Sequence, residues 1–296
     1  MRVVLAGASG LIGSALRCSL RADGVAVTTL VRRPPDNPDE ARWAPQRAEL
    51  DASVLAGADA VVCLSGAGVG DHRWTESYKS VLRSSRLDSV TTLATAMGRL
   101  GDGPGVLVSA SAVGYYGDTG EREVDESARR GSGFLAELCE EWEAATRPAE
   151  GAGIRVAHLR TGLVLSGDGG LLKRLKPIMA LGVGGRLGSG RQFMPWISLA
   201  DEVAAIRFVL EREVSGPVNL TGPVPVRNAD LIAVLARLLH RPAVVPAPGF
   251  ALRIVLGEFA QETLTGQRAV PTKLTDAGFT HHHADVESAL RWALGR

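Results

Sequence analysis

A glycine-rich turn near the N-terminus constrains the fold of this chain more than any other sequence feature. The apolar run Val3 to Ala6 leads directly into the segment GASGLIG, and apolar residues then recur every three to four positions. A strand, a glycine turn and a helix in this order bring backbone N–H groups and the positive end of a helix close to a pyrophosphate. The turn therefore predicts a dinucleotide site, with a tight turn and no ligand as the alternative. The residues expected to form this site are Gly7, Ser9, Gly10, Leu11, Ile12 and Gly13.

The alternation of strand and helix continues along the first half of the chain. Buried strands are expected at 2–6, 25–31, 58–64, 105–109 and 155–159, and helices at 11–21, 78–100 and 133–150. Successive units of this kind predict an α/β fold with a Rossmann-type doubly wound parallel sheet. Beyond Arg160, glycines and prolines interrupt the pattern. We expect residues 1–160 to form the dinucleotide-binding core. Residues 161–296 are expected to form a smaller substrate-binding region, with some segments returning to the core sheet.

The end of the second expected strand indicates which dinucleotide is bound. Arg32 and Arg33 stand roughly 20 residues after the glycine turn, where this type of fold places the group that contacts the adenosine ribose. A carboxylate there would accept hydrogen bonds from a free 2′-hydroxyl, whereas a guanidinium pairs with a 2′-phosphate. The sequence therefore predicts NADP(H) rather than NAD. The alternative is two solvated arginines ahead of a Pro-Pro loop.

Composition argues against several other classes of protein. The 296 residues carry 33 Lys and Arg against 32 Asp and Glu, and the resulting net charge of +1 disfavours nucleic-acid binding. No uncharged stretch reaches the roughly 20 residues of a membrane helix, and three cysteines without CxxC spacing suggest neither disulfides nor a zinc site. The run His281 to His283 is interpreted as a solvated loop, because consecutive residues do not easily converge on one metal ion. We expect a soluble cytoplasmic protein with no membrane partner and no metal.

Several segments together resemble the extended short-chain dehydrogenase/reductase superfamily. They are the GxxGxxG spacing of the turn, the run LSGA at 64–67 and the run SASAVGYYG at 109–117. The segments GFLAELCEEWE, RQFMPWISLADEV and GQRAVPTKLTDAGF further resemble its epimerase-like subfamily, often described as nucleoside-diphosphate-sugar epimerases or cell division inhibitors. The resemblance implies a Rossmann core, bound NADP and a C-terminal substrate region. It also implies cofactor contacts from Leu64, Ser65, Gly66, Ala67, Ser109, Arg160, Thr161 and Gly162.

The catalytic groups depart from the superfamily pattern. Members usually work with a Ser and with a Tyr-x-x-x-Lys pair on a helix, but the corresponding helix positions here are Phe134 and Leu138. Without a phenol beside an ammonium group, the ordinary proton relay between alcohol and ketone is missing. Ser111 matches the superfamily serine, or else it is a strand-end serine bonded to backbone. Tyr115 or Tyr116 is the candidate replacement acid.

The remaining candidates concern the substrate. Arg191, Gln192 and Trp196 lie in a basic and aromatic segment that suits a phosphorylated or glycosyl substrate, although Trp196 could simply pack in a core. For Arg160 the alternative is an ion pair at the sheet end. The leading hypothesis is an NADP-dependent oxidoreductase or epimerase-like enzyme acting on a small, unidentified substrate, with a sugar or nucleotide sugar as one candidate. The alternative is a non-catalytic NADP(H)-binding redox sensor or regulator, and either protein could be a homodimer.

Overall fold

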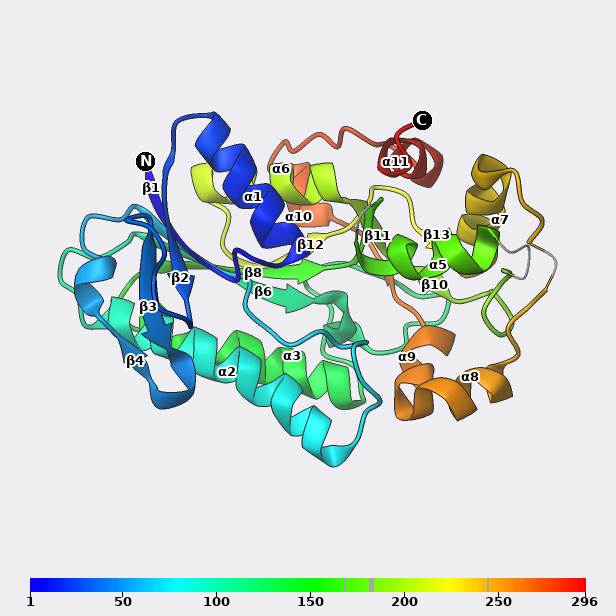
Figure 1. The fold of residues 1–296 in the computed structure, drawn as a ribbon, viewed down its shortest axis with the longest axis horizontal. Helices are drawn as coiled ribbons and strands as arrows, with labels where there is room; N and C mark the ends of the chain where they lie inside the picture. Colours follow the sequence, from blue (N-terminus) through cyan, green and yellow to red (C-terminus); the bar gives the residue numbers. More distant parts are fainter. Residues whose placement is uncertain (168, 181–183, 244) are drawn as a thin grey trace.

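A sheet of eight strands forms the centre of the computed structural model, which describes residues 1–167, 169–180, 184–243 and 245–296 (Figure 1). The strand order is β12-β8-β6-β5-β1-β2-β3-β4. The strands are β1 (Arg2–Ala6), β2 (Ala26–Val31), β3 (Glu40–Ala44), β4 (Glu49–Leu50), β5 (Ala60–Cys63), β6 (Val106–Ala112), β8 (Arg155–Thr161) and β12 (Gly216–Leu220). Neighbouring strands are parallel except for β3 and β4. The predicted Rossmann-type doubly wound sheet is confirmed.

Helices cover both faces of this sheet (Figure 1). On one face, α1 (Leu11–Ala22) packs against α6 (Leu199–Glu211); on the other, α2 (Glu76–Gly98) packs against α3 (Phe134–Ala144) and α4 (Arg147–Glu150). In β1, Val3 and Leu5 join the core under α1 and α6, whereas Val4 and Ala6 join the core under α2. Because both faces are covered, the strand is an unbroken apolar run rather than an alternating one.

The second half of the chain adds a smaller body beside the sheet. Three two-stranded sheets pair β9 (Leu163–Ser166) with β11 (Trp196–Ser198), β10 (Phe193–Met194) with β13 (Val226–Arg227), and β7 (Glu123–Val124) with β14 (Arg268–Ala269). The helices of this smaller body are α5 (Gly170–Ala180), α7 (Asn228–Leu239), α8 (Gly249–Leu256), α9 (Ala260–Leu264) and α11 (Val286–Ala293), whereas α10 (Thr272–Asp276) packs against β12 of the central sheet. Figure 1 shows α8 and α9 at the end of the molecule opposite β3 and β4. No helix in the described ranges combines the length and apolarity needed to cross a membrane.

Some boundaries differ from those expected from the sequence. Strand β6 continues to Ala112, because β8 runs on to Thr161 and gives its last residues a partner. The expected helix 133–150 is split, with Pro148 in the first turn of α4, where its missing N–H does no harm. The expected solvated histidine loop is also partly wrong. His281 and His283 are half-buried, and His283 Nδ1 lies 3.0 Å from Asp201 Oδ2.

The strand order predicts a ligand-binding crevice between two neighbouring loops. From β1 the chain moves to β2 on one side, and it later reaches β5 on the other side. The carboxyl ends of β1 and β5 therefore flank the topological switch point, the position at which doubly wound sheets bind ligands.

Candidate cofactor and catalytic site

The three glycines of the first turn have different structural roles. Gly7 has a φ of 84°, and a Cβ there would lie 2.6 Å from the Leu64 carbonyl carbon, in the loop after β5. A Cβ on Gly13 would lie 2.2 Å from the Gly7 oxygen. Gly10 differs, because its Cβ would meet only the Gly7 oxygen, at 3.5 Å, and the residue is exposed. Gly7 and Gly13 therefore serve backbone packing, whereas Gly10 keeps open a surface that a ligand can approach.

The start of α1 has the features of an anion site. Gly10 is the N-cap and offers no capping side chain, and the first turn contains no acidic residue. The first N–H groups of the helix are thus left without intrahelical partners at the positive end of the helix dipole. Ser9 is exposed beside them, and Leu11 and Ile12 are half-buried. This open cradle fits the pyrophosphate of a dinucleotide.

The two arginines after β2 differ in their partners. Arg33 forms a bidentate pair with Glu40, with both N–O distances at 2.8 Å, and also contacts Asp36 at 2.7 Å. The hydrogen bonds from Arg33 hold the pKa of Glu40 down at about 2. Arg32 is exposed and has no hydrogen bond or ion pair within the described ranges. Arg32 is therefore the guanidinium available to a 2′-phosphate.

The other expected cofactor residues divide into accessible and buried ones. Leu64, Ser65 and Ala67 are half-buried beside the crevice, and Gly66 is exposed. Ser109 is fully buried and presents no surface to a ligand in this structure. Thr161 Oγ1 donates to Glu202 Oε1 at 2.9 Å. Gly162 packs against backbone, since a Cβ there would lie 2.2 Å from the Pro195 oxygen.

Ser111 and Arg160 belong to a buried polar network. Ser111 Oγ donates to Glu143 Oε1 at 2.8 Å, and Arg160 holds the same carboxylate through Nε and Nη2 at 2.8 and 2.9 Å. Arg160 Nη1 donates to the Tyr116 hydroxyl at 3.0 Å, and that hydroxyl donates to Asn219 Oδ1 at 2.7 Å. Burial opposes the charge on Arg160, but the bonds to Glu143 outweigh it and raise the pKa of the guanidinium. Arg160 thus forms the sheet-end ion pair, and Ser111 is bonded to a carboxylate rather than to backbone.

The structure distinguishes the two adjacent tyrosines. Tyr116 is 1% exposed, and burial raises the pKa of its hydroxyl to about 12. Tyr115 is half-buried, and its ring centroid lies 3.5 Å from the Arg160 guanidinium carbon. No residue in the described part of the chain hydrogen-bonds the Tyr115 hydroxyl. Because a proton donor must reach its substrate, Tyr115 fits the role of acid better than Tyr116.

An apolar cluster surrounds Phe134 and Leu138, the positions where the resemblance places the Tyr and Lys of the superfamily. Phe134, at the start of α3, contacts Trp74 edge to face with ring centroids 5.1 Å apart. Trp74 also lies 5.2 Å from Phe259, centroid to centroid, so the cluster joins α3 to the C-terminal half of the chain. Leu138, one turn further along α3, is 1% exposed within the same cluster. Neither position carries a group that transfers protons.

The three expected substrate residues are not equally accessible. Arg191 is exposed, with Nη2 3.8 Å from Glu121 Oε1. Gln192 is half-buried, and its Oε1 is buried without a hydrogen-bond partner. Trp196 is 1% exposed, and its indole N–H donates to the Val224 oxygen at 3.0 Å. Trp196 therefore packs in the core. Its burial contradicts the prediction that this side chain contacts a substrate.

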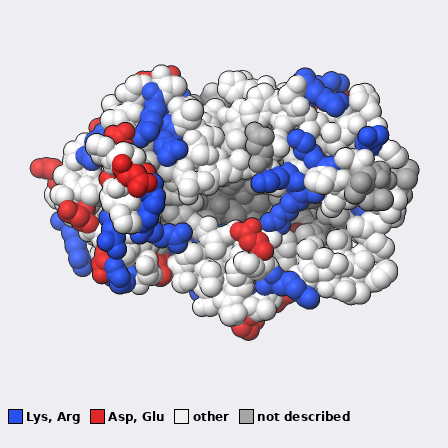
Figure 2. Space-filling model, viewed as in Figure 1, with Lys and Arg blue, Asp and Glu red and all other residues white. Residues whose placement is uncertain are grey.

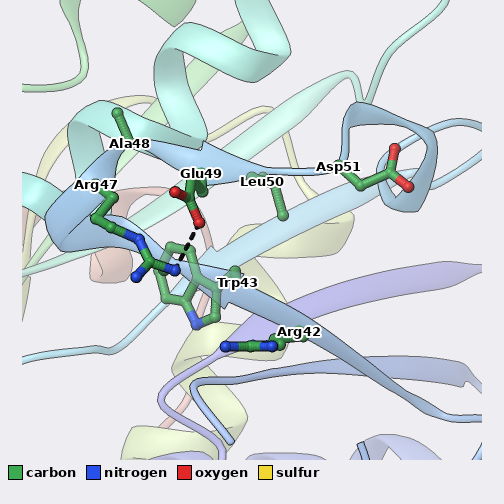
Figure 3. Close-up of a pocket in the computed structure, with 8 residues that line it drawn as sticks. Arg42, Trp43, Arg47, Ala48, Glu49, Leu50 and Asp51 are labelled. Atoms are coloured by element: carbon green, nitrogen blue, oxygen red, sulfur yellow. Dashed lines mark hydrogen bonds and ion pairs between the residues drawn. The ribbon is translucent and has the colours of Figure 1, made fainter. Parts of the chain in front are cut away.

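The molecular surface contains a hollow and a separate depression. Figure 2, which has the same view as Figure 1, shows the hollow near the centre of the molecule, with basic side chains on both sides of it. The depression, of about 430 Å³, lies at the β3–β4 edge around Trp43, Arg42 and the ion pair of Arg47 with Glu49 (Figure 3). Strand β2 separates β3 from β1, so this depression is not part of the crevice between β1 and β5.

The sheet, the glycine turn and the open helix end define a dinucleotide-binding protein of the short-chain dehydrogenase/reductase class. Residues 3–221 match the model of the NAD dependent epimerase/dehydratase family, and residues 247–293 match a domain of unknown function, DUF1731. The chain therefore belongs to the NAD-dependent epimerase/dehydratase family.

Individual relatives agree with this assignment over the whole chain. An epimerase family protein of Mycobacterium bovis is 48% identical over 296 residues, which cover 99% of this chain and 98% of the relative. The mouse epimerase family protein SDR39U1 is 33% identical, covering 98% and 99% of the two chains. The crystal structure of human SDR39U1 with NADPH matches with a TM-score of 0.92 at 32% identity, covering 100% of this chain and 99% of the human one.

Glu143 and Asn219, which complete the buried network, are not among the residues expected from the sequence. Glu143 follows Ala136 and Cys139 at intervals of three and four residues, so it lies on the buried stripe of α3. An acid on such a stripe is a signal that could have been used. Asn219 carries no comparable signal, because its partner Tyr116 is 103 residues away in the sequence.

Proposed function

We propose that this protein binds NADPH in the crevice between β1 and β5. The observation that carries this proposal is the cradle formed by Gly7, Gly10 and the uncapped start of α1, with Arg32 free to pair with a 2′-phosphate. The human relative whose structure contains NADPH supports the same cofactor. Gly66, exposed in the loop after β5, would lie against the bound dinucleotide.

Isothermal titration calorimetry tests the cofactor. We expect NADPH to bind at least roughly tenfold more tightly than NADH, a difference of about 1.4 kcal/mol. Equal affinities would contradict the assignment of Arg32 to the 2′-phosphate. Absence of binding by either cofactor would contradict the proposal as a whole.

We further propose that the protein is an oxidoreductase or epimerase-like enzyme for a small substrate, with Tyr115 as its acid. Bound NADPH supplies a hydride, and the Tyr115 hydroxyl would donate the proton to the substrate oxygen and regain one from water. Ser111 and Tyr116 are held inside the buried network. Ser111 is connected to Tyr115 only through Glu143 and Arg160, whereas the Tyr116 ring also contacts the Tyr115 ring edge to face, with centroids 5.5 Å apart. Arg191 and Gln192 remain candidates for substrate contact.

A panel of sugar, nucleotide-sugar and simple carbonyl substrates tests the enzymatic proposal, with NADPH absorbance reporting net reduction and product analysis reporting epimerisation, which consumes no cofactor. If Tyr115 is the acid, Tyr115→Phe abolishes the activity found and leaves NADPH affinity unchanged. Activity that survives Tyr115→Phe would contradict this role.

The apolar cluster at Phe134 and Leu138 favours a second candidate, a non-catalytic NADP(H)-binding regulator. Such a regulator should bind NADPH tightly in the calorimetric titration and turn over none of the substrates in the panel.

A further inference from the structure

Arg86 is a buried cation that has no carboxylate partner in the described part of the chain. It lies in α2 with 8% of its surface exposed, and its guanidinium carbon is 4.9 Å from the ring centroid of Trp142. Nη1 donates to the Leu82 oxygen and Nη2 to the Ala67 oxygen, both at 3.0 Å. These carbonyl groups satisfy donors, but they are neutral and leave the positive charge unbalanced.

The ionisable neighbours of Arg86 do not supply the missing negative charge. Burial raises the pKa of Cys139 to about 12 and also raises the pKa of Tyr78, so both side chains are neutral at neutral pH. Burial lowers the pKa of Arg86 itself. Arg160 is buried as deeply, but Glu143 neutralises it. Burying a charge without a counter-charge costs several kcal/mol, so we expect a ligand to provide one.

The guanidinium lies directly behind the loop that follows β5. A Cβ on Gly66 would lie 3.2 Å from Arg86 Cζ, so the glycine permits this close approach. Two residues of α2 hydrogen-bond the backbone of Ala67. The Ala67 N–H donates to Ser85 Oγ at 3.0 Å, and the Ala67 carbonyl oxygen accepts from Arg86. Gly66 is exposed at the front of this loop. Leu64 and Ser65, the first residues of the loop, lie close to Gly7 in the glycine turn. A ligand in the crevice would be separated from the cation by one thickness of backbone.

We propose that Arg86 is a positioning residue for the dinucleotide, and that the phosphates of bound NADPH supply the counter-charge that this buried arginine lacks. The inference rests on the proposed function. It implies that the free protein carries an unfavourable charge, which ligand binding relieves. Removal of the charge should therefore affect the free protein and the complex in opposite directions.

The test combines thermal melting of the free protein with calorimetric titration of NADPH. Arg86→Met removes the charge while keeping much of the apolar contact with Trp142. We expect its free form to melt no lower than the parent and its NADPH affinity to fall roughly tenfold. Arg86→Lys retains the charge and should recover part of the affinity. Arg160→Met is the matched control, because it leaves Glu143 buried and unpaired and should lower the melting temperature.

The outcomes separate this inference from the proposed function. If the parent protein does not bind NADPH, the proposed function fails. If the parent binds and Arg86→Met binds equally well, only the inference fails. An Arg86→Met protein that melts at as low a temperature as Arg160→Met but keeps its NADPH affinity would show that Arg86 has a purely structural role. That result would also overturn the inference. If Arg86→Met does not fold, Arg86→Gln, which can still donate to the Ala67 oxygen, provides the same comparison.

Discussion

At the level of single residues, Arg32 and Arg33 are neighbours with different expected effects on cofactor selectivity. Arg32→Ala should weaken NADPH binding by about 2 kcal/mol, because one charge-assisted pair with the 2′-phosphate is lost. NADH binding should not change. Arg33→Ala is the matched control and should leave NADPH affinity nearly unchanged, since Glu40 already holds this guanidinium. Calorimetry with both cofactors measures the difference, and equal losses for the two variants would contradict it.

Two glycines of the same turn provide a second contrast at this level. Gly10→Val should abolish NADPH binding in a folded protein, because the side chain would project into the open cradle from an ordinary backbone conformation. Gly13→Ala should instead lower the melting temperature, because its Cβ would overlap the Gly7 oxygen. Melting curves and NADPH titrations of both variants check this. Normal NADPH binding by Gly10→Val would show that the turn is only structural.

At the level of the elements, α3 has hydrophobic contacts at the two positions, 134 and 138, where the family resemblance places the proton relay of the superfamily. Leu138→Lys would place an ammonium group in the apolar cluster with Leu82 and Trp74, and we expect a loss of roughly 3 kcal/mol or more in the free energy of unfolding. Leu138→Met should cost under about 1.5 kcal/mol, because volume and polarity are nearly conserved. Urea denaturation compares the two variants. A Leu138→Lys protein as stable as Leu138→Met would show that this helix position can still accommodate the superfamily lysine.

At the level of the whole molecule, stability should depend on pH through Glu202 in α6. Burial raises the pKa of this carboxyl from 4.5 to about 8, and the only side chain bonded to it in the described ranges is Thr161. Between these two values the folded state holds a proton that the unfolded state has released, so stability falls as pH rises from about 4.5 to 8. Below this window both states are protonated, and above it neither is.

Glu202→Gln tests this pH dependence. The amide cannot ionise, so the variant should be more stable than the parent above pH 8, on the order of 5 kcal/mol, and the advantage should shrink toward pH 5. Denaturation curves at several pH values give the difference. A constant difference across the whole range would rule out titration of Glu202 as its cause.

The sequence alone was sufficient to predict the Rossmann core and the glycine turn. Both depend on local patterns: the apolar run from Val3 to Ala6 in β1, the helical periodicity of α1 and the spacing of Gly7, Gly10 and Gly13. Such patterns extend over a few residues and follow directly from the geometry of strands, helices and turns. The absence of a phenol at position 134 and of an amine at position 138 was equally evident, because the helix that carries them is recognisable from its sequence.

Only the tertiary structure decided which side chain of each candidate pair is available. Arg33 is neutralised by Glu40 and Arg32 is not; Tyr116 is buried against Asn219 and Tyr115 is not. Ser111 meets Glu143 across 32 residues of sequence, and Tyr116 meets Asn219 across 103. Contacts between residues so far apart depend on how helices pack on the sheet, and local periodicity contains no record of that packing. The same reason hid Arg86, whose unbalanced charge becomes evident only when its surroundings in the folded chain are known.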